Sequence, residues 1–95
     1  MAGYIIADVQ ITDPEEYARY RALVPGTLAA HGGRFLVRGG AHETLEGDWR
    51  PGRVVVLEFE SVERARAWYY SDEYEEAKAL RQRASTGNIL IVEGA

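Results

Sequence analysis

The chain has 95 residues, and its 46% hydrophobic and 27% charged content excludes an extensively disordered protein. The absence of cysteine excludes disulfides, thiolate nucleophiles and zinc-thiolate sites. A net charge of −4 without a basic stripe argues against nucleic acid as a partner, and no apolar run approaches the roughly 20 residues of a membrane span. We therefore expect one cytoplasmic domain, residues 1–95, that binds neither nucleic acid nor membrane.

Residues 4–11 alternate between a purely apolar face and a mixed one, which predicts a strand. A helix is predicted next, from Pro14 to about His31, because Asp13 can cap it and proline suits the first helical position. Its expected buried stripe is Tyr17, Tyr20, Val24 and Leu28. Pro25 lies inside this span and predicts a kink or a break.

Two further strands are predicted at 35–38 and 53–59, joined by a loop that is longer than a hairpin requires. In the first, Phe35 and Val37 should share one face, and the other should carry Arg34, Leu36 and Arg38. In the second, both faces are largely apolar, so both should be covered.

The last third of the chain predicts a helix, a bend, a longer helix and a strand. Ser61 can cap the first helix and Ser71 the second. Gly87 is expected to end the second helix, which leaves 88–93 as the final strand. The inward residues should be Val62, Ala65, Trp68, Tyr69, Tyr74, Ala77, Leu80 and Arg81.

The predicted order of strand, helix, strand, strand, helix, strand is that of the α+β, ferredoxin-like βαββαβ fold with an antiparallel sheet. Helices would cover one sheet face and leave the other open. That open face would carry Tyr4, Ile6, Asp8, Gln10, Val54, Val56 and Glu58, which is too apolar for water and contains acids unsuited to a dry core. Two arrangements would suit such a mixed face: packing against a second copy, and a polar cavity. The two arrangements are compatible.

Several segments carry a resemblance to a known family. They are D-P-E-E-Y from Asp13, H-G-G-R-F-L-V-R-G-G from His31, L-E-G-D-W-R-P from Leu45, V-V-L-E-F from Val55, and W-Y-Y-S-D-E-Y with K-A-L-R from Trp68. Together they make the chain similar to a small bacterial family known only as a domain of unknown function, in the dimeric α+β barrel superfamily. The resemblance implies a ferredoxin-like homodimer and no established reaction. Relatives of this architecture include cofactor-free monooxygenases and isomerases, so the fold selects no class.

Two residues are candidate catalytic groups. His31 is the best available general acid or base if it faces a cleft, and the alternative is a cap at the end of its helix. Arg38 shares its predicted face with Arg34, so the two could bind a carboxylate or enolate; the alternative is pairing with Asp8 or Glu58. No third ligand accompanies His31 and His42, so we expect no metal site.

The candidate substrate-binding residues are Glu58, Trp49, Trp68, Tyr69 and Tyr74. Trp49 could cover a pocket or fill a dimer contact, and the spacing of the other aromatics is as typical of a core as of a binding site. Arg81 is expected to pair with Glu76 or Glu73, or to turn inward.

Three functions remain open on this evidence. The first is a homodimer that binds a small organic acid or aromatic between sheet and helices and acts on it without a cofactor, by proton transfer or oxygenation. The cleft would be lined by His31, Arg38, Glu58, Trp68 and Tyr69. The others are a binding module without catalysis and a structural dimer without a ligand. Whether the protein is an enzyme is not decided by its sequence.

Overall fold

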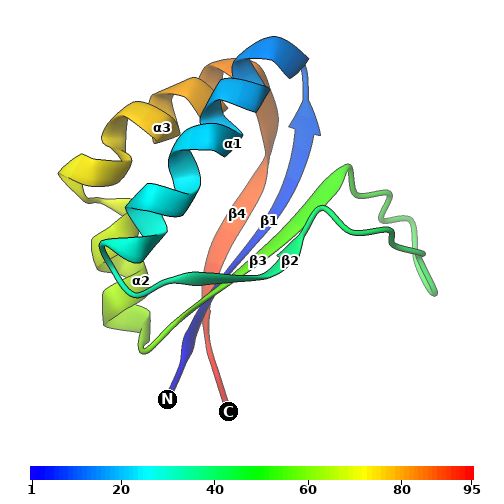
Figure 1. The fold of residues 1–95 in the computed structure, drawn as a ribbon. Helices are drawn as coiled ribbons and strands as arrows, with labels where there is room; N and C mark the ends of the chain where they lie inside the picture. Colours follow the sequence, from blue (N-terminus) through cyan, green and yellow to red (C-terminus); the bar gives the residue numbers. More distant parts are fainter.

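The computed structural model describes residues 1–95, and seven elements follow one another along the chain. They are β1 (Gly3–Ile11), α1 (Pro14–Ala29), β2 (Arg34–Arg38), β3 (Arg53–Phe59), α2 (Val62–Tyr69), α3 (Asp72–Ala84) and β4 (Ser85–Glu93). The strands form one antiparallel sheet in the order β2-β3-β1-β4. All three helices lie on one side of it (Figure 1), which confirms the predicted α+β, ferredoxin-like fold. None of the helices has the length and apolar character needed to cross a membrane.

The core lies between β1, β3 and the helices. Ile5, Ala7 and Val9 of β1 are buried and alternate with residues of the other face, as the sequence predicts. Leu57 and Phe59 of β3 are buried on the same side of the sheet. The largest fully buried side chains are Trp68, Tyr74, Phe59 and Ile5. The helix-facing surface of the sheet is therefore the one that builds the core.

All three predicted helix caps are present. The Asp13 carboxylate accepts a hydrogen bond from the amide of residue 16, at 3.2 Å. The Ser61 and Ser71 hydroxyls accept from the amides three residues later, at 3.1 Å and 3.2 Å. Each cap satisfies an amide that has no partner within its own helix, so the helix starts were predictable from local sequence.

Two predicted boundaries differ from the structure. α1 runs through Pro25 without a break. α3 ends at Ala84 instead of near Gly87, because the Ser85 hydroxyl donates to the carbonyl of Arg81 and the chain passes directly into β4. Gly87 lies inside β4, where an added Cβ would overlap the backbone carbonyl of Asp8, so it is a strand glycine and not a helix stop.

A bulge in β2 corrects the predicted direction of Arg38. Phe35 pairs with Leu57 and Arg38 with Val55, so Leu36 is an extra residue between them. A shift of one residue moves the following side chains to the opposite face of a strand. Arg38 therefore lies on the helix side of the sheet with Phe35, and Arg34 remains on the open side.

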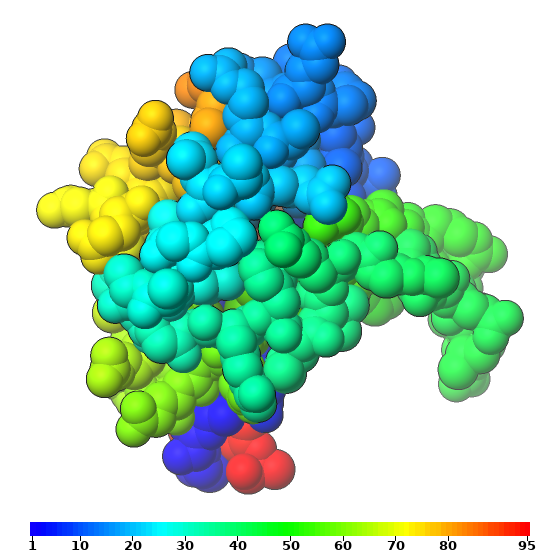
Figure 2. Space-filling model, viewed as in Figure 1, coloured from blue at the N-terminus to red at the C-terminus, as the bar shows by residue number.

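Residues 41–52 form an arm that projects from the body on the side of the sheet away from the helices (Figures 1 and 2). Its Leu45 and Trp49 side chains are 85% and 60% exposed. The arm is anchored at its base by Asp8, whose two carboxylate oxygens accept from Trp49 Nε1 at 2.8 Å and from the Gly52 amide at 2.9 Å. The acid on the open face thus has a structural role.

Candidate functional site

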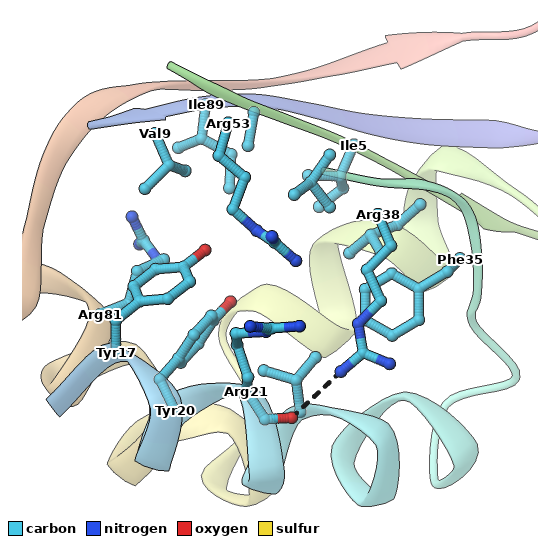
Figure 3. Close-up of a pocket in the computed structure, with 14 residues that line it drawn as sticks. Ile5, Val9, Tyr17, Tyr20, Arg21, Phe35, Arg38, Arg53, Arg81 and Ile89 are labelled. Carbon is cyan, nitrogen blue, oxygen red and sulfur yellow. Dashed lines mark hydrogen bonds between the residues drawn. The ribbon is translucent and has the colours of Figure 1, made fainter. Parts of the chain in front are cut away.

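A cavity lies between α1 and the sheet face that the helices cover (Figure 3). Every strand contributes to its wall, together with α1 and one residue of α3. It is lined by Ile5, Ala7, Val9, Tyr17, Tyr20, Arg21, Val24, Phe35, Arg38, Arg53, Val55, Leu57, Arg81 and Ile89. The wall is thus apolar or aromatic except for four arginines, and no carboxylate belongs to it.

Arg53 points from β3 toward α1 across the middle of the cavity (Figure 3). Its guanidinium lies against Gly39, where an added Cβ would overlap it, and its Cζ is 5.8 Å from the centre of the Tyr17 ring. Gly39 also has a positive φ of 72°, a conformation that favours glycine. Arg53 Nε is buried and has no hydrogen-bond partner. A buried N–H without an acceptor destabilises the folded state, and an acceptor on a bound ligand would remove this cost.

Arg38 is held at the mouth of the cavity by two contacts. Its Cζ lies 4.3 Å from the centre of the Phe35 ring, within the range of a cation–π interaction. Its Nη2 donates to the backbone carbonyl of Arg21 at 3.2 Å. In an α-helix that carbonyl would bond the amide of residue 25, but Pro25 has no N–H. The proline therefore leaves an acceptor for the arginine.

The far end of the cavity contains a chain of three polar side chains. Arg81 Nε donates to the Tyr74 hydroxyl at 3.3 Å, and the hydroxyls of Tyr74 and Tyr20 are 3.0 Å apart. Burial raises the pKa of Tyr20 above its ordinary value, and Tyr74 adds to this effect. Burial also raises the pKa of Tyr74, and outweighs the opposing effects of Tyr20 and Arg81. Both phenols are therefore neutral hydrogen-bonding groups at physiological pH.

The cavity concentrates positive charge in an apolar setting. The ion pairs of the chain are Arg19 and Arg83 with Glu16, and Arg34 with Glu58, and His31 is hydrogen-bonded to Glu73. None of the four cavity arginines has a carboxylate partner. Unpaired cations beside apolar surface suit an anionic ligand with an apolar body.

The cavity is narrow as it stands. Its space, including the open mouth, is about 470 Å³, but its interior has room for only a water or two. Arg21 and Arg38 are exposed at the mouth and have long, flexible side chains, so a larger ligand would enter by moving them.

The other predicted catalytic residue, His31, lies away from this cavity. Its Nε2 is 2.6 Å from a carboxylate oxygen of Glu73, which links the end of α1 to the start of α3. His42, in the arm, contacts the carbonyl of Pro51 at 3.1 Å. The structure contains no cluster of three or more histidine, cysteine, aspartate or glutamate side chains that could hold a metal ion.

Two predicted binding residues, Glu58 and Trp49, lie on the open side of the sheet, and of these Glu58 was expected in the cleft. Glu58 accepts hydrogen bonds from Arg34 Nε at 2.6 Å and from the Tyr4 hydroxyl at 3.2 Å. Arg34 therefore pairs with an acid, as the second of its two predicted roles requires. Trp49 lies in the arm, with its indole nitrogen bonded to Asp8.

The other predicted aromatics divide between core and surface groove. Trp68 is fully buried, and its indole N–H is satisfied by the Thr27 hydroxyl at 3.0 Å, so it has no donor left for a ligand. Tyr69 borders a second, more open groove of about 540 Å³ beside β4, together with Tyr70 and Arg66. Tyr74 lies behind the cavity wall and contacts it through Tyr20 and Arg81.

Sequence reasoning missed Arg21 and Arg53 as site residues. Arg53 follows the same alternation as Val55 and Leu57, which places it on the helix-facing side, and this signal was available. Arg81 is seven residues after Tyr74, so its inward direction also fits the helical period. Arg21 lies four residues after Tyr17 and three before Val24, so the helical period also places it beside the buried stripe of α1.

The chain matches a family described as "Domain of unknown function (DUF1330)" over residues 2–95. No curated protein matches it. Among solved structures it is similar to the RPA0582 protein of unknown function from Rhodopseudomonas palustris, at 19% identity and a TM-score of 0.79, covering 99% of this chain and 82% of that one.

Two more distant solved structures have the same architecture. SnoaB, a cofactor-independent oxygenase from Streptomyces nogalater, is 12% identical with a TM-score of 0.65, over 99% of this chain and 93% of that one. A dimeric ferredoxin-like protein of unknown function from Jannaschia sp. CCS1 is 14% identical with a TM-score of 0.65, over 100% of this chain and 99% of that one. These similarities agree with the predicted ferredoxin-like fold and do not assign a reaction.

Proposed function

We propose that this protein, which belongs to the DUF1330 family, is a cytoplasmic homodimer that binds a small organic anion in the cavity between α1 and the sheet. One observation carries the proposal: four arginines and no carboxylate line an apolar cavity, and one buried guanidinium nitrogen, Arg53 Nε, has no partner. An oxyanion would supply the missing acceptor, and the apolar wall would hold the rest of the molecule.

The four arginines divide into two pairs by exposure. Arg21 and Arg38 are exposed at the mouth, whereas Arg53 and Arg81 are partly buried. Ion pairs are strengthened where water is excluded, so the inner pair should contribute more to affinity than the outer pair. The outer pair, being exposed at the mouth, would attract the anion toward the cavity.

Cofactor-free oxygenation by molecular oxygen is the further step that this site favours, ahead of proton transfer. The cavity lining has no histidine or carboxylate that could remove a proton, and Tyr20 remains neutral. A substrate would therefore react in its anionic form, and nearby guanidinium groups lower the pKa of a bound enol or phenol. The similarity to SnoaB supports the fold in which such chemistry would occur, and the arginines support the anionic substrate.

A second copy is the partner that the open sheet face favours. Leu36, Val37, Leu90 and Val92 are exposed apolar residues of the two edge strands, β2 and β4. Apolar strand residues left in water favour association, and a second copy presents the same patch. The similarity to a dimeric ferredoxin-like protein supports this arrangement.

Thermal unfolding in the presence of small carboxylates, phenols and their uncharged analogues tests the proposed ligand class. A ligand at about 100 times its Kd stabilises the folded state by about 2.7 kcal/mol, which would raise the Tm of a domain of this size by roughly 10 °C or more. We expect acids to stabilise and their amides or methyl ethers not to. Incubating each binding acid in air and under argon, with mass analysis of products, then separates binding from oxygenation.

Two variants assign a stabilising acid to this cavity. Arg38→Met should weaken the effect, whereas His31→Ala should leave it in place because His31 lies outside the lining. The solution mass of the same samples tests the dimer. Leu90→Asp on the open face should yield monomers. Leu23→Asp, the same change at another exposed leucine on α1, should not.

A further inference from the structure

The hydrogen-bond chain at the far end of the cavity has a direction. Arg81 has only donors, so its Nε donates to the Tyr74 oxygen, 3.3 Å away. Tyr74 is fully buried, and the Tyr20 oxygen at 3.0 Å is the acceptor within its reach. If Tyr20 instead donated to Tyr74, the proton of Tyr74 would be buried without an acceptor, which carries the full cost of desolvation. Tyr74 therefore donates to Tyr20.

This direction leaves the proton of the Tyr20 hydroxyl free. Tyr20 belongs to the cavity lining and Tyr74 does not. The ring of Tyr20 rises from α1 toward the sheet, with its oxygen on the cavity side (Figure 3). Its proton is thus available to an acceptor inside the cavity. The cationic Arg81 at the other end of the chain polarises both hydroxyls and strengthens Tyr20 as a donor.

We infer that Tyr20 is a ligand-binding residue that donates a hydrogen bond to a carboxylate oxygen in the cavity, with Tyr74 as its positioning residue. This inference rests on the proposed function and narrows it, because a group that presents only acceptors suits both the free Tyr20 proton and the arginines of the same lining. Amines and amide N–H groups would meet donors on every side. Burial keeps the pKa of both phenols raised, so the donor persists across the neutral range.

The test is an NMR titration of the full-length protein with benzoate, phenylacetate and hexanoate. Tyr20→Phe removes the donor, and Tyr70→Phe is the matched control because its phenol is exposed outside the cavity. We expect Tyr20→Phe to weaken binding of the tightest carboxylate about tenfold or more, the effect of losing a hydrogen bond to a charged group. Tyr70→Phe should change it less than twofold, and both variants should keep the amide spectrum of the folded chain.

The outcomes separate this inference from the proposed function. If Arg53→Met abolishes binding but Tyr20→Phe binds as the original chain does, the anion site stands and the role of Tyr20 is refuted. If none of the three carboxylates binds the original chain, both are refuted. Should Tyr20→Phe unfold, Tyr74→Phe gives the decision, because it removes the hydroxyl that positions Tyr20 and leaves the Tyr20 proton in place. Its loss of affinity should be smaller than that of Arg53→Met and clearly larger than that of Tyr70→Phe, and a loss no larger than that of Tyr70→Phe would contradict the inference.

Discussion

Arg38 Nη2 donates to the backbone carbonyl of Arg21 at 3.2 Å, and the carbonyl is available because Pro25 has no amide proton to bond it. A residue that looks like a helix breaker in the sequence therefore supplies an acceptor at the mouth of the cavity. This hydrogen bond links β2 to α1 and fixes the position of Arg38, one of the cavity arginines.

Replacing Pro25 by alanine should separate stability from binding. The new amide would bond Arg21, which removes the cost of an interior proline, so the free energy of unfolding should rise by about 1–3 kcal/mol. Arg38 would lose its acceptor, and affinity for a bound acid should fall severalfold. Denaturant unfolding and ligand titration measure the two effects. Pro14→Ala is the control, because proline suits the first helical turn; a parallel gain there would mean that the effect is not specific to Pro25.

Stability should decrease in alkaline solution because of Tyr20 and Tyr74. Burial raises the pKa of both above the usual tyrosine value of about 10. Above pH 10 the unfolded chain releases these protons while the folded chain retains them, so unfolding becomes more favourable by about 1.4 kcal/mol per pH unit for each group. Urea unfolding at several values above pH 9 should show this slope. Tyr20→Phe should reduce it, and an unchanged slope would contradict the assignment.

The stability of the fold should depend on the hydrogen bond from the Trp68 indole N–H to the Thr27 hydroxyl. Thr27→Val keeps the shape but removes the acceptor at 3.0 Å, which leaves a fully buried N–H without a partner. The expected loss is about 1–3 kcal/mol in the free energy of unfolding, measured by tryptophan fluorescence in urea. Thr27→Ser retains the hydroxyl and should lose clearly less; equal losses would assign the effect to packing instead.

The arm should be released when Asp8 is replaced. Asp8→Ala removes the acceptors of both Trp49 Nε1 and the Gly52 amide. Chymotrypsin should then cut after Leu45 or Trp49 several times faster, because an unanchored loop exposes its backbone more often. Asp48→Ala is the control, because it also removes one negative charge but leaves both of these hydrogen bonds in place. Similar cleavage rates for the two variants would mean that Asp8 does not anchor the arm.

Local signals in the sequence were sufficient for most of the fold. Alternation on β1 predicted which of its residues are buried, and Asp13, Ser61 and Ser71 marked the helix starts by capping. These features depend on neighbours a few residues away, so they can be read from the chain itself.

The site was less predictable because it depends on contacts between distant segments. The bulge at Leu36 reverses the face of Arg38, and nothing in the local alternation marks it. His31 and Trp68 have the right chemistry for a site, but Glu73 and Thr27 engage them elsewhere. The alternation along β3 does place Arg53 on the core-facing side. It is also the first residue of the strand, and a charged residue at a strand end is easily taken to be exposed.

The charge-matched variants Arg53→Met and Arg64→Met test anion binding in the cavity most directly. Each removes one positive charge, but Arg53 lies in the cavity lining and Arg64 is exposed on α2. With a stabilising carboxylate at a fixed concentration, we expect the rise in Tm to disappear in Arg53→Met and to remain in Arg64→Met. Equal rises in both variants, or no rise with any acid in the original chain, would contradict an anion site between α1 and the sheet.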